Sequence, residues 1–154
     1  MQRNKNIFDM IGSLIPGYCG YAEREGRRQC DKILRDQTST TIGYCEKAIK
    51  KQIETNIDNN SLTQSRLLEV CRKKLNTLSS RIQYAPYGES AFFGNLQLKE
   101  EELLEIYRKD LKIMDVVNII KESVFNANPE NLLSIIDNIE QLIDNRNQYI
   151  KEFK

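Results

Sequence analysis

Histidine is absent from the 154 residues of this sequence. It is the side chain most often used as a general base near neutral pH, and the commonest protein ligand of transition metals. Its absence excludes Ser-His-Asp triads, HExxH zinc motifs and the Glu-x-x-His pairs of helical di-metal proteins. The glycine-rich phosphate-binding motifs GxxxxGK[ST] and GxGxxG are also missing. We therefore expect no catalytic residues, no metal ligands, no cofactor and no enzymatic activity.

Cysteine is sparse, and its spacing is uninformative for metal binding. The four residues, Cys19, Cys30, Cys45 and Cys71, form no CxxC pair and no zinc-ribbon spacing. An even number of cysteines permits two disulfides, but a helical bundle of this size does not need them. We expect free thiols that pack as small hydrophobic side chains, as is typical of a cytoplasmic protein.

Long hydrophobic runs are missing as well. No stretch approaches the roughly 20 apolar residues of a membrane-spanning helix. The apolar run from Ile7 to Ile15 follows Arg3 and Lys5 as in a small signal peptide, but Asp9 interrupts it and no small-x-small cleavage site follows. We expect a cytoplasmic chain.

Charge of one sign is not in excess. The chain has 23 Lys and Arg against 22 Asp and Glu, so its net charge is +1. No global field draws it to nucleic acid, and we expect no nucleic-acid partner. With 40% hydrophobic and 29% charged residues, the composition is that of a folded protein, and the length predicts a single domain over residues 1–154.

Helical periodicity is the strongest feature that is present. After a short N-terminal helix within residues 1–17, apolar residues recur every three or four positions through 19–58, 61–83, 99–126 and 129–152. The clearest repeats are Ile42, Cys45, Ile49, Ile53 and Ile57; Leu68, Cys71, Leu75, Leu78 and Ile82; Leu104, Tyr107, Leu111 and Met114, extended by Val117, Ile120 and Val124; and Leu132, Ile136, Ile139, Ile143 and Ile150. This pattern predicts an all-α antiparallel up-down bundle of three to four long helices with coiled-coil-like seams.

Two details of the long helices can be tested. Thr38 to Gly43 are poor helix formers, so residues 19–58 form either one long helix, which we favour, or two helices with a break near 37–43. The short loop at 58–61, where Ser61 is a predicted N-cap, makes its two helices antiparallel neighbours. Residues whose numbers add up to about 119, such as Cys45 and Lys74, should then lie level.

The connection 84–97 is rich in aromatic residues. Four rings, from Tyr84, Tyr87, Phe92 and Phe93, are seldom left in solvent together. The helix that ends at Ile82 should finish level with Gln37, which leaves residues 20–36 of the first long helix without a neighbour. We therefore predict that the segment 84–93 packs against residues 21–34, with arginines over the rings. The rings then form either a second core or an exposed binding groove.

A row of basic residues faces this predicted contact. On a helix, Arg24, Arg28, Lys32 and Arg35 share one face, and such a row can hold phosphate or a partner's carboxylates. The i,i+4 pairs Glu23–Arg27, Arg27–Asp31 and Asp31–Arg35 neutralise most of its charge. The pattern therefore favours a solvated face with salt bridges.

The sequence favours a non-enzymatic module that binds another protein through an aromatic and arginine surface. The candidate binding residues are Tyr21, Arg24, Arg28, Tyr84, Tyr87, Phe92 and Phe93. The alternative is a peripheral membrane factor that uses Ile7 to Ile15 as an amphipathic contact. The pattern does not identify the partner, and the long seams can close within one chain or across a homodimer.

Overall fold

The structure, a computed structural model, describes residues 6–57, 62–85, 87, 90–126 and 128–154. Its helices are α1 (Ile7–Leu14), α2 (Arg27–Ile57), α3 (Leu62–Gln83), α4 (Glu100–Ser123) and α5 (Pro129–Lys151). Short 3-10 turns occur at Arg24–Gly26 and Ala91–Phe93, and the described residues contain no strand. The predicted all-α bundle is confirmed, with four long helices after one short helix.

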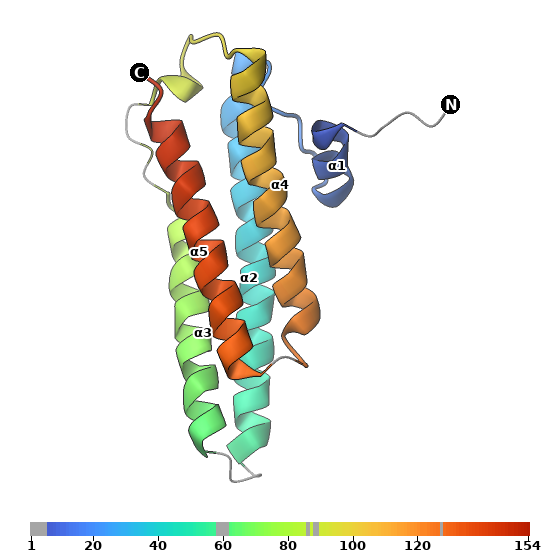
Figure 1. Ribbon diagram of the computed structural model, residues 1–154, viewed down its shortest axis with the longest axis vertical. Helices are drawn as coiled ribbons and strands as arrows, with labels where there is room; N and C mark the ends of the chain where they lie inside the picture. The colour runs from blue at the N-terminus through green and yellow to red at the C-terminus, as the bar shows by residue number, and fades with distance from the viewer. Residues whose placement is uncertain (1–5, 58–61, 86, 88–89, 127) are drawn as a thin grey trace, which may run out of the picture.

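The four long helices form two antiparallel hairpins (Figure 1), and the contacts between the helices place one helix at each corner of a square. Hairpin α2–α3 packs beside hairpin α4–α5, with α2 next to α4 and α3 next to α5. Among the described residues, α3 and α4 make no comparable contact, although they follow one another in the chain. The connection between them therefore crosses the end of the bundle from one corner to the opposite one, which places its aromatic residues over that end.

The predicted apolar repeats of α3 and α5 are confirmed. All five predicted positions on each helix are buried, as are Ile42, Cys45 and Ile49 of α2. Each such aliphatic side chain contributes roughly 1.5–3 kcal/mol by leaving water. The register of α2 on α3 agrees with the prediction within about one residue, because Ser39 Oγ lies 2.8 Å from Ser79 Oγ and Glu46 pairs with Arg72 at 3.0 Å.

Helix α2 runs unbroken through its threonine-rich part. The Thr38 and Thr41 hydroxyls donate to the carbonyls of Leu34 and Gln37, one turn earlier, at 2.8 and 3.0 Å. These bonds satisfy the hydroxyls inside the helix and remove their competition with the backbone. The alternative of a break near 37–43 is therefore wrong.

The predicted start of this helix at residue 19 is wrong, because α2 begins at Arg27. Gly17 and Gly20 have φ angles of 84° and 80°, a left-handed conformation that glycine adopts without strain. A Cβ atom at Gly20 would lie 2.7 Å from both the Phe8 ring and the Tyr107 hydroxyl. This irregular segment turns Tyr18 and Tyr21 into the protein interior.

The predicted seam of α4 is also partly wrong. Leu104 is 37% exposed, and the core positions in this half of the helix are Ile106, Asp110 and Ile113. Tyr107 and Leu111 are only partly buried, on the flank of the helix. The periodicity missed the true face because a charged residue, Asp110, occupies its centre.

Helix α1 packs on α4 (Figure 1). Asn6 caps it by accepting a 2.8 Å hydrogen bond from the Asp9 amide, and Ile11 and Ile15 are buried. In the described part of the chain, no helix is both long and apolar enough to cross a bilayer.

The ends of the other helices follow ordinary capping rules. Asn128 caps α5 by accepting from the Asn131 amide at 2.8 Å, and the Glu102 carboxylate accepts from the Lys99 amide at 2.8 Å at the start of α4. Helix α4 ends at Ser123, short of the predicted residue 126. The predicted N-cap at Ser61 lies outside the described residues.

Candidate binding surface and the buried network beneath it

The aromatic connection closes the upper end of the bundle, as predicted. Phe92 is fully buried, and its ring centroid lies 5.3 Å from that of Tyr21. Tyr87 donates a 2.8 Å hydrogen bond to Asp31 of α2. Residues 86, 88 and 89 of the predicted segment lie outside the described residues. The contact between the connection and residues 21–34 is therefore confirmed for Tyr87, Phe92 and Phe93, whose rings belong to a second core. The prediction is wrong for Tyr84, which is 75% exposed.

The aromatic connection forms a cap over the upper end of the bundle. Arginines of α2 lie over the half-buried rings of this cap. The Arg28 guanidinium carbon is 4.9 Å from the centre of the Phe93 ring, and that of Arg35 is 5.9 Å from the centre of the Tyr87 ring. Both distances are within the range of cation–π attraction. Arg28 is exposed, so its guanidinium is a polar outer layer over an aromatic surface.

Arg27 does not belong to a solvated salt-bridge ladder, and that prediction is wrong. Its side chain is buried and donates to backbone carbonyls of Tyr21 at 2.9 Å, Phe92 at 3.2 Å and Leu96 at 2.6 Å. Of the three predicted i,i+4 pairs, only Asp31–Arg35 forms among the described residues, at 2.9 Å. Arg27 instead ties the irregular segment before α2 to the cap.

Arg24 also departs from the predicted row. It lies in the 3-10 turn before α2, where it donates to the Asn95 side-chain oxygen and stands 3.7 Å from the Glu25 carboxylate. Both partners are exposed. The continuous helical row is therefore shorter than predicted and begins at Arg28.

A cluster of buried charged and phenolic groups lies under the cap. Asp110 of α4 is fully buried and accepts hydrogen bonds from the hydroxyls of Tyr18 at 2.7 Å and Tyr21 at 2.6 Å. Arg146 of α5 donates from Nε to the other carboxylate oxygen of Asp110 at 2.6 Å and from Nη2 to the Tyr21 hydroxyl at 2.8 Å. The cluster thus joins three parts of the chain that are far apart in sequence.

The second side of Arg146 extends this cluster to α2. Its Nη1 lies 2.9 Å from Asp31 and donates to the Tyr87 hydroxyl at 2.9 Å. Asp31 also pairs with Arg35, whose Nη1 donates to the carbonyl of Gln83 at 2.7 Å. Two carboxylates and two guanidiniums therefore balance in charge, and the buried side-chain polar atoms of the described residues all have partners.

Burial governs the proton affinities of this cluster. Burial raises the pKa of Tyr87 to about 12, although the guanidinium of Arg146 opposes the shift. Burial likewise raises the pKa of Tyr21 well above its ordinary value. For Arg146 burial is the largest single influence and lowers the pKa, but Asp110, Tyr21, Tyr87 and Asp31 together outweigh it and the net pKa is raised. The guanidinium therefore stays charged and the phenols stay protonated at neutral pH.

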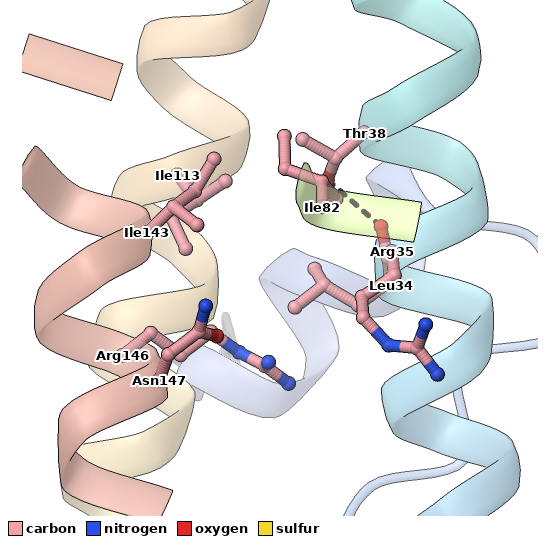
Figure 2. Close-up of a pocket in the computed structure, with 8 residues that line it drawn as sticks. All are labelled: Leu34, Arg35, Thr38, Ile82, Ile113, Ile143, Arg146 and Asn147. Carbon is pink, nitrogen blue, oxygen red and sulfur yellow. Dashed lines mark hydrogen bonds between the residues drawn. The ribbon is translucent and has the colours of Figure 1, made fainter. Parts of the chain in front are cut away.

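A cavity that reaches this cluster is very small. Its volume is about 10 Å³, room for roughly one water molecule. Figure 2 shows its lining, with Arg146 reaching from α5 toward α2, and Thr38 and Leu34 on the opposite side. The cavity has no space for an organic substrate.

The structure divides the predicted binding residues into three groups. Tyr21 and Phe92 are fully buried, so their predicted role as contact residues is corrected to a role in the core. Tyr87 and Phe93 are half-buried, Arg28 is exposed over the Phe93 ring, and Arg24 is exposed next to Asn95. Tyr84 is 75% exposed but lies apart, in a groove with Ile143 and Asp144 of α5.

Sequence reasoning missed the buried charges Asp31, Asp110 and Arg146. A signal for them was present, because Arg146 continues the step of Ile139 and Ile143 toward Ile150. A charged residue at a core position of a strong repeat needs a buried partner of opposite charge.

The described residues hold no group of histidine, cysteine, aspartate and glutamate side chains arranged for a metal ion. Comparisons with known proteins do not assign the chain to a family: no protein-family model matches it, and neither a curated protein nor a solved structure shows significant similarity.

Proposed function

We propose that this protein is a non-enzymatic module that binds an acidic segment of another protein at its capped end. The cap surface, defined as Arg28, Lys32, Tyr87 and Phe93, supports this role. The observation that carries the proposal is the exposed Arg28 guanidinium, held 4.9 Å over the half-buried Phe93 ring. Arginine and aromatic side chains are the residues most enriched among interface hot spots.

The cap surface is also rigid, which favours binding. Its rings are fixed from below by buried contacts, with Phe93 against Phe92 at 5.0 Å and Tyr87 hydrogen-bonded to Asp31. A surface that is ordered before binding loses little conformational entropy when a partner docks. The buried cluster thus acts as a support for the cap.

The charge of the cap surface indicates the chemistry of the partner. Lys32 is exposed one turn after Arg28, on the same face of α2. Among the described residues, neither side chain forms an ion pair. A segment that carries carboxylates can therefore bind both cations without breaking an ion pair within the described part of the chain.

A catalytic role is less well supported. The titratable groups of the buried cluster are engaged with one another, and the adjoining cavity holds about one water molecule. A general acid or base must reach a reacting atom of the substrate, which requires space beside it.

A charge-reversal experiment tests the proposal. The full chain, with Arg28→Glu and Lys32→Glu together, is used as bait in an extract of its native host, beside the wild type. The matched control is Lys47→Glu with Lys51→Glu, an exposed pair at the same spacing further along α2. Circular dichroism verifies that both variants are folded.

We expect the wild type and the control to capture the same protein, and the cap variant to lose it by at least about tenfold, as removal of a hot-spot charge does. Equal capture by the cap variant, or equal loss from the control, contradicts the proposal.

The membrane alternative is not favoured by the position of α1. Ile11 and Ile15, the centre of its apolar side, are buried against the bundle. Its larger exposed apolar side chains are Met10 and Leu14, at 40% and 36%. Membrane-surface helices need a broad apolar face that is open to lipid.

A further inference from the structure

Helices α3 and α5 present two parallel stripes of opposite charge on one face of the bundle. The exposed cations of α3 on this face are Lys73, Lys74 and Arg81. The anions of α5 are Asp137 and Asp144, which are exposed, and Glu140, which is partly exposed. The two helices run in the same direction, side by side (Figure 1). The face is therefore basic along one edge and acidic along the other.

The ion pairs between the stripes are regular. Lys74 pairs with Asp137 at 2.9 Å, and two turns further on Arg81 pairs with Asp144 at 2.6 Å. All four side chains remain between 42% and 59% exposed. Each charge therefore keeps open sides on which it can meet a second opposite charge.

Exposed apolar side chains mark both ends of the same face. Tyr84 is 75% exposed at the upper end, beside a groove of about 600 Å³ that Ile143 and Asn147 also line. Val70 is 43% exposed at the lower end. A second groove of about 360 Å³, lined by Thr77 and Arg81 among others, lies between them. Apolar surface at both ends makes the face suited to covering by another molecule.

We propose that this face binds a second copy of the same chain, in a dimer whose two-fold axis is parallel to the bundle axis. Rotation about such an axis places α3 of each copy against α5 of the other, so that basic stripes meet acidic stripes twice. Rotation about an axis across the helices would instead place α3 against α3, with like charges opposed. Charge complementarity therefore selects both the partner and its orientation.

The same orientation also covers the exposed apolar residues. Since Lys74 lies level with Asp137 and Arg81 with Asp144, Tyr84 lies level with Asn147. Across the two-fold axis, each Tyr84 ring therefore rests against the upper groove of the other copy, next to its Ile143. Apolar contact and charge pairing thus agree on one arrangement.

The size of the face predicts a weak dimer. From Arg66 to Tyr84 the face is about 27 Å long at 1.5 Å per residue, and two adjacent helices are roughly 18 Å wide, which gives on the order of 500 Å² per copy. Interfaces of this size are at the lower limit for specific complexes. This inference is independent of the proposed function, because the proposed partner binds the cap surface at Arg28 and Lys32 of α2, whereas the dimer face lies on α3 and α5.

Sedimentation velocity on the full chain, from about 1 µM to about 500 µM, tests the dimer, because weak interfaces need such concentrations. We expect the mass to rise toward that of two chains, and to fall again at high salt, where exposed ion pairs are screened. One variant carries Lys74→Glu and Arg81→Glu, and a second carries Asp137→Lys and Asp144→Lys. Each alone should weaken self-association by at least about tenfold, and an equimolar mixture should restore a dimer of one copy of each.

Two controls keep the test decisive. The Lys47→Glu and Lys51→Glu variant, away from this face, should dimerise as the wild type does. Tyr84→Ala removes an exposed ring without changing charge, so it should weaken the dimer with no loss of folding even if the charge variants are unstable. A wild type that stays at the mass of one chain throughout, an undiminished dimer in Tyr84→Ala, or folded charge variants whose mixture stays monomeric would each overturn the proposal.

Discussion

The two ends of this bundle are stabilised by different chemistry. The lower core is aliphatic, with residues such as Ile49, Leu75 and Ile139 and the thiols of Cys45 and Cys71. The upper core combines rings with the buried cluster of Asp31, Asp110 and Arg146. Aliphatic packing is non-directional, whereas a buried ion cluster is stable only when every charge has its partner. The upper core should therefore be the less tolerant of single changes, and the more specific in its arrangement.

The largest expected effect is the loss of Arg146. Arg146→Ala leaves Asp110 and Asp31 buried without their cation, which should lower the free energy of unfolding by about 3–5 kcal/mol. Urea denaturation followed by circular dichroism measures this loss. A decrease below about 1 kcal/mol, the level of an exposed ion pair, would show that the two cores do not differ in this way.

A cavity in the lower core should cost somewhat less. Leu75 is fully buried among aliphatic neighbours, and Leu75→Ala should destabilise the protein by about 2–4 kcal/mol. Denaturation under the same conditions allows a direct comparison with Arg146→Ala. The comparison would be reversed if Leu75→Ala proved the more damaging of the two.

Rising pH should destabilise the lower end of the bundle first and the upper end at higher pH. Burial raises the pKa of Cys45 and Cys71 to about 11 from 9.0, and that of Tyr87 to about 12 from 10.0. The unfolded chain loses these protons first, so the stability they contribute is complete below pH 9 and is lost as the pH rises toward 12. Because burial raises the pKa of Tyr87 from 10.0 to about 12, deprotonation of this residue should lower the free energy of unfolding by roughly 2–3 kcal/mol.

Variants can separate these contributions. Urea denaturation from pH 8 to 12 measures the free energy of unfolding of the wild type and of two variants. Above pH 10 this free energy should fall less steeply for Tyr87→Phe than for the wild type. For the variant with both Cys45→Ala and Cys71→Ala, the fall should begin at a higher pH. Identical profiles for all three proteins would mean that these groups do not govern the alkaline limit.

The smallest effect is expected at the exposed layer of the cap. Arg28→Ala removes a cation from above the Phe93 ring and should cost less than about 1 kcal/mol. A much greater loss of stability would place Arg28 in the core, and would remove it from the surface available to a partner.

The same contrast explains what the sequence could predict. The repeat of Leu68, Cys71 and Leu75 revealed α3 and its buried face because aliphatic residues report burial by their type alone. The contact between the aromatic connection and α2 was also predictable, since the predicted helix lengths showed which part of α2 would lack a neighbour. Both predictions needed only local spacing and simple geometry.

The buried cluster needed information that local spacing does not contain. Asp110 and Arg146 are 36 residues apart and are stable inside only because they meet each other. The inward turn of Tyr18 and Tyr21 depends in turn on Asp110, so helical periodicity alone predicts a start of α2 that is too early. Residue type alone predicts a surface position for a charged side chain, whereas the pairing of two buried charges is a property of the tertiary fold.

A double-mutant cycle on Asp110→Asn and Arg146→Gln tests most directly whether the upper core depends on its buried ion cluster. Urea denaturation of the wild type, both single variants and the double variant gives the coupling energy of the pair. We predict a coupling of about 2–3 kcal/mol, against less than about 1 kcal/mol for the same cycle on the exposed pair Arg81 and Asp144. Equal and small couplings for the two pairs would contradict the account.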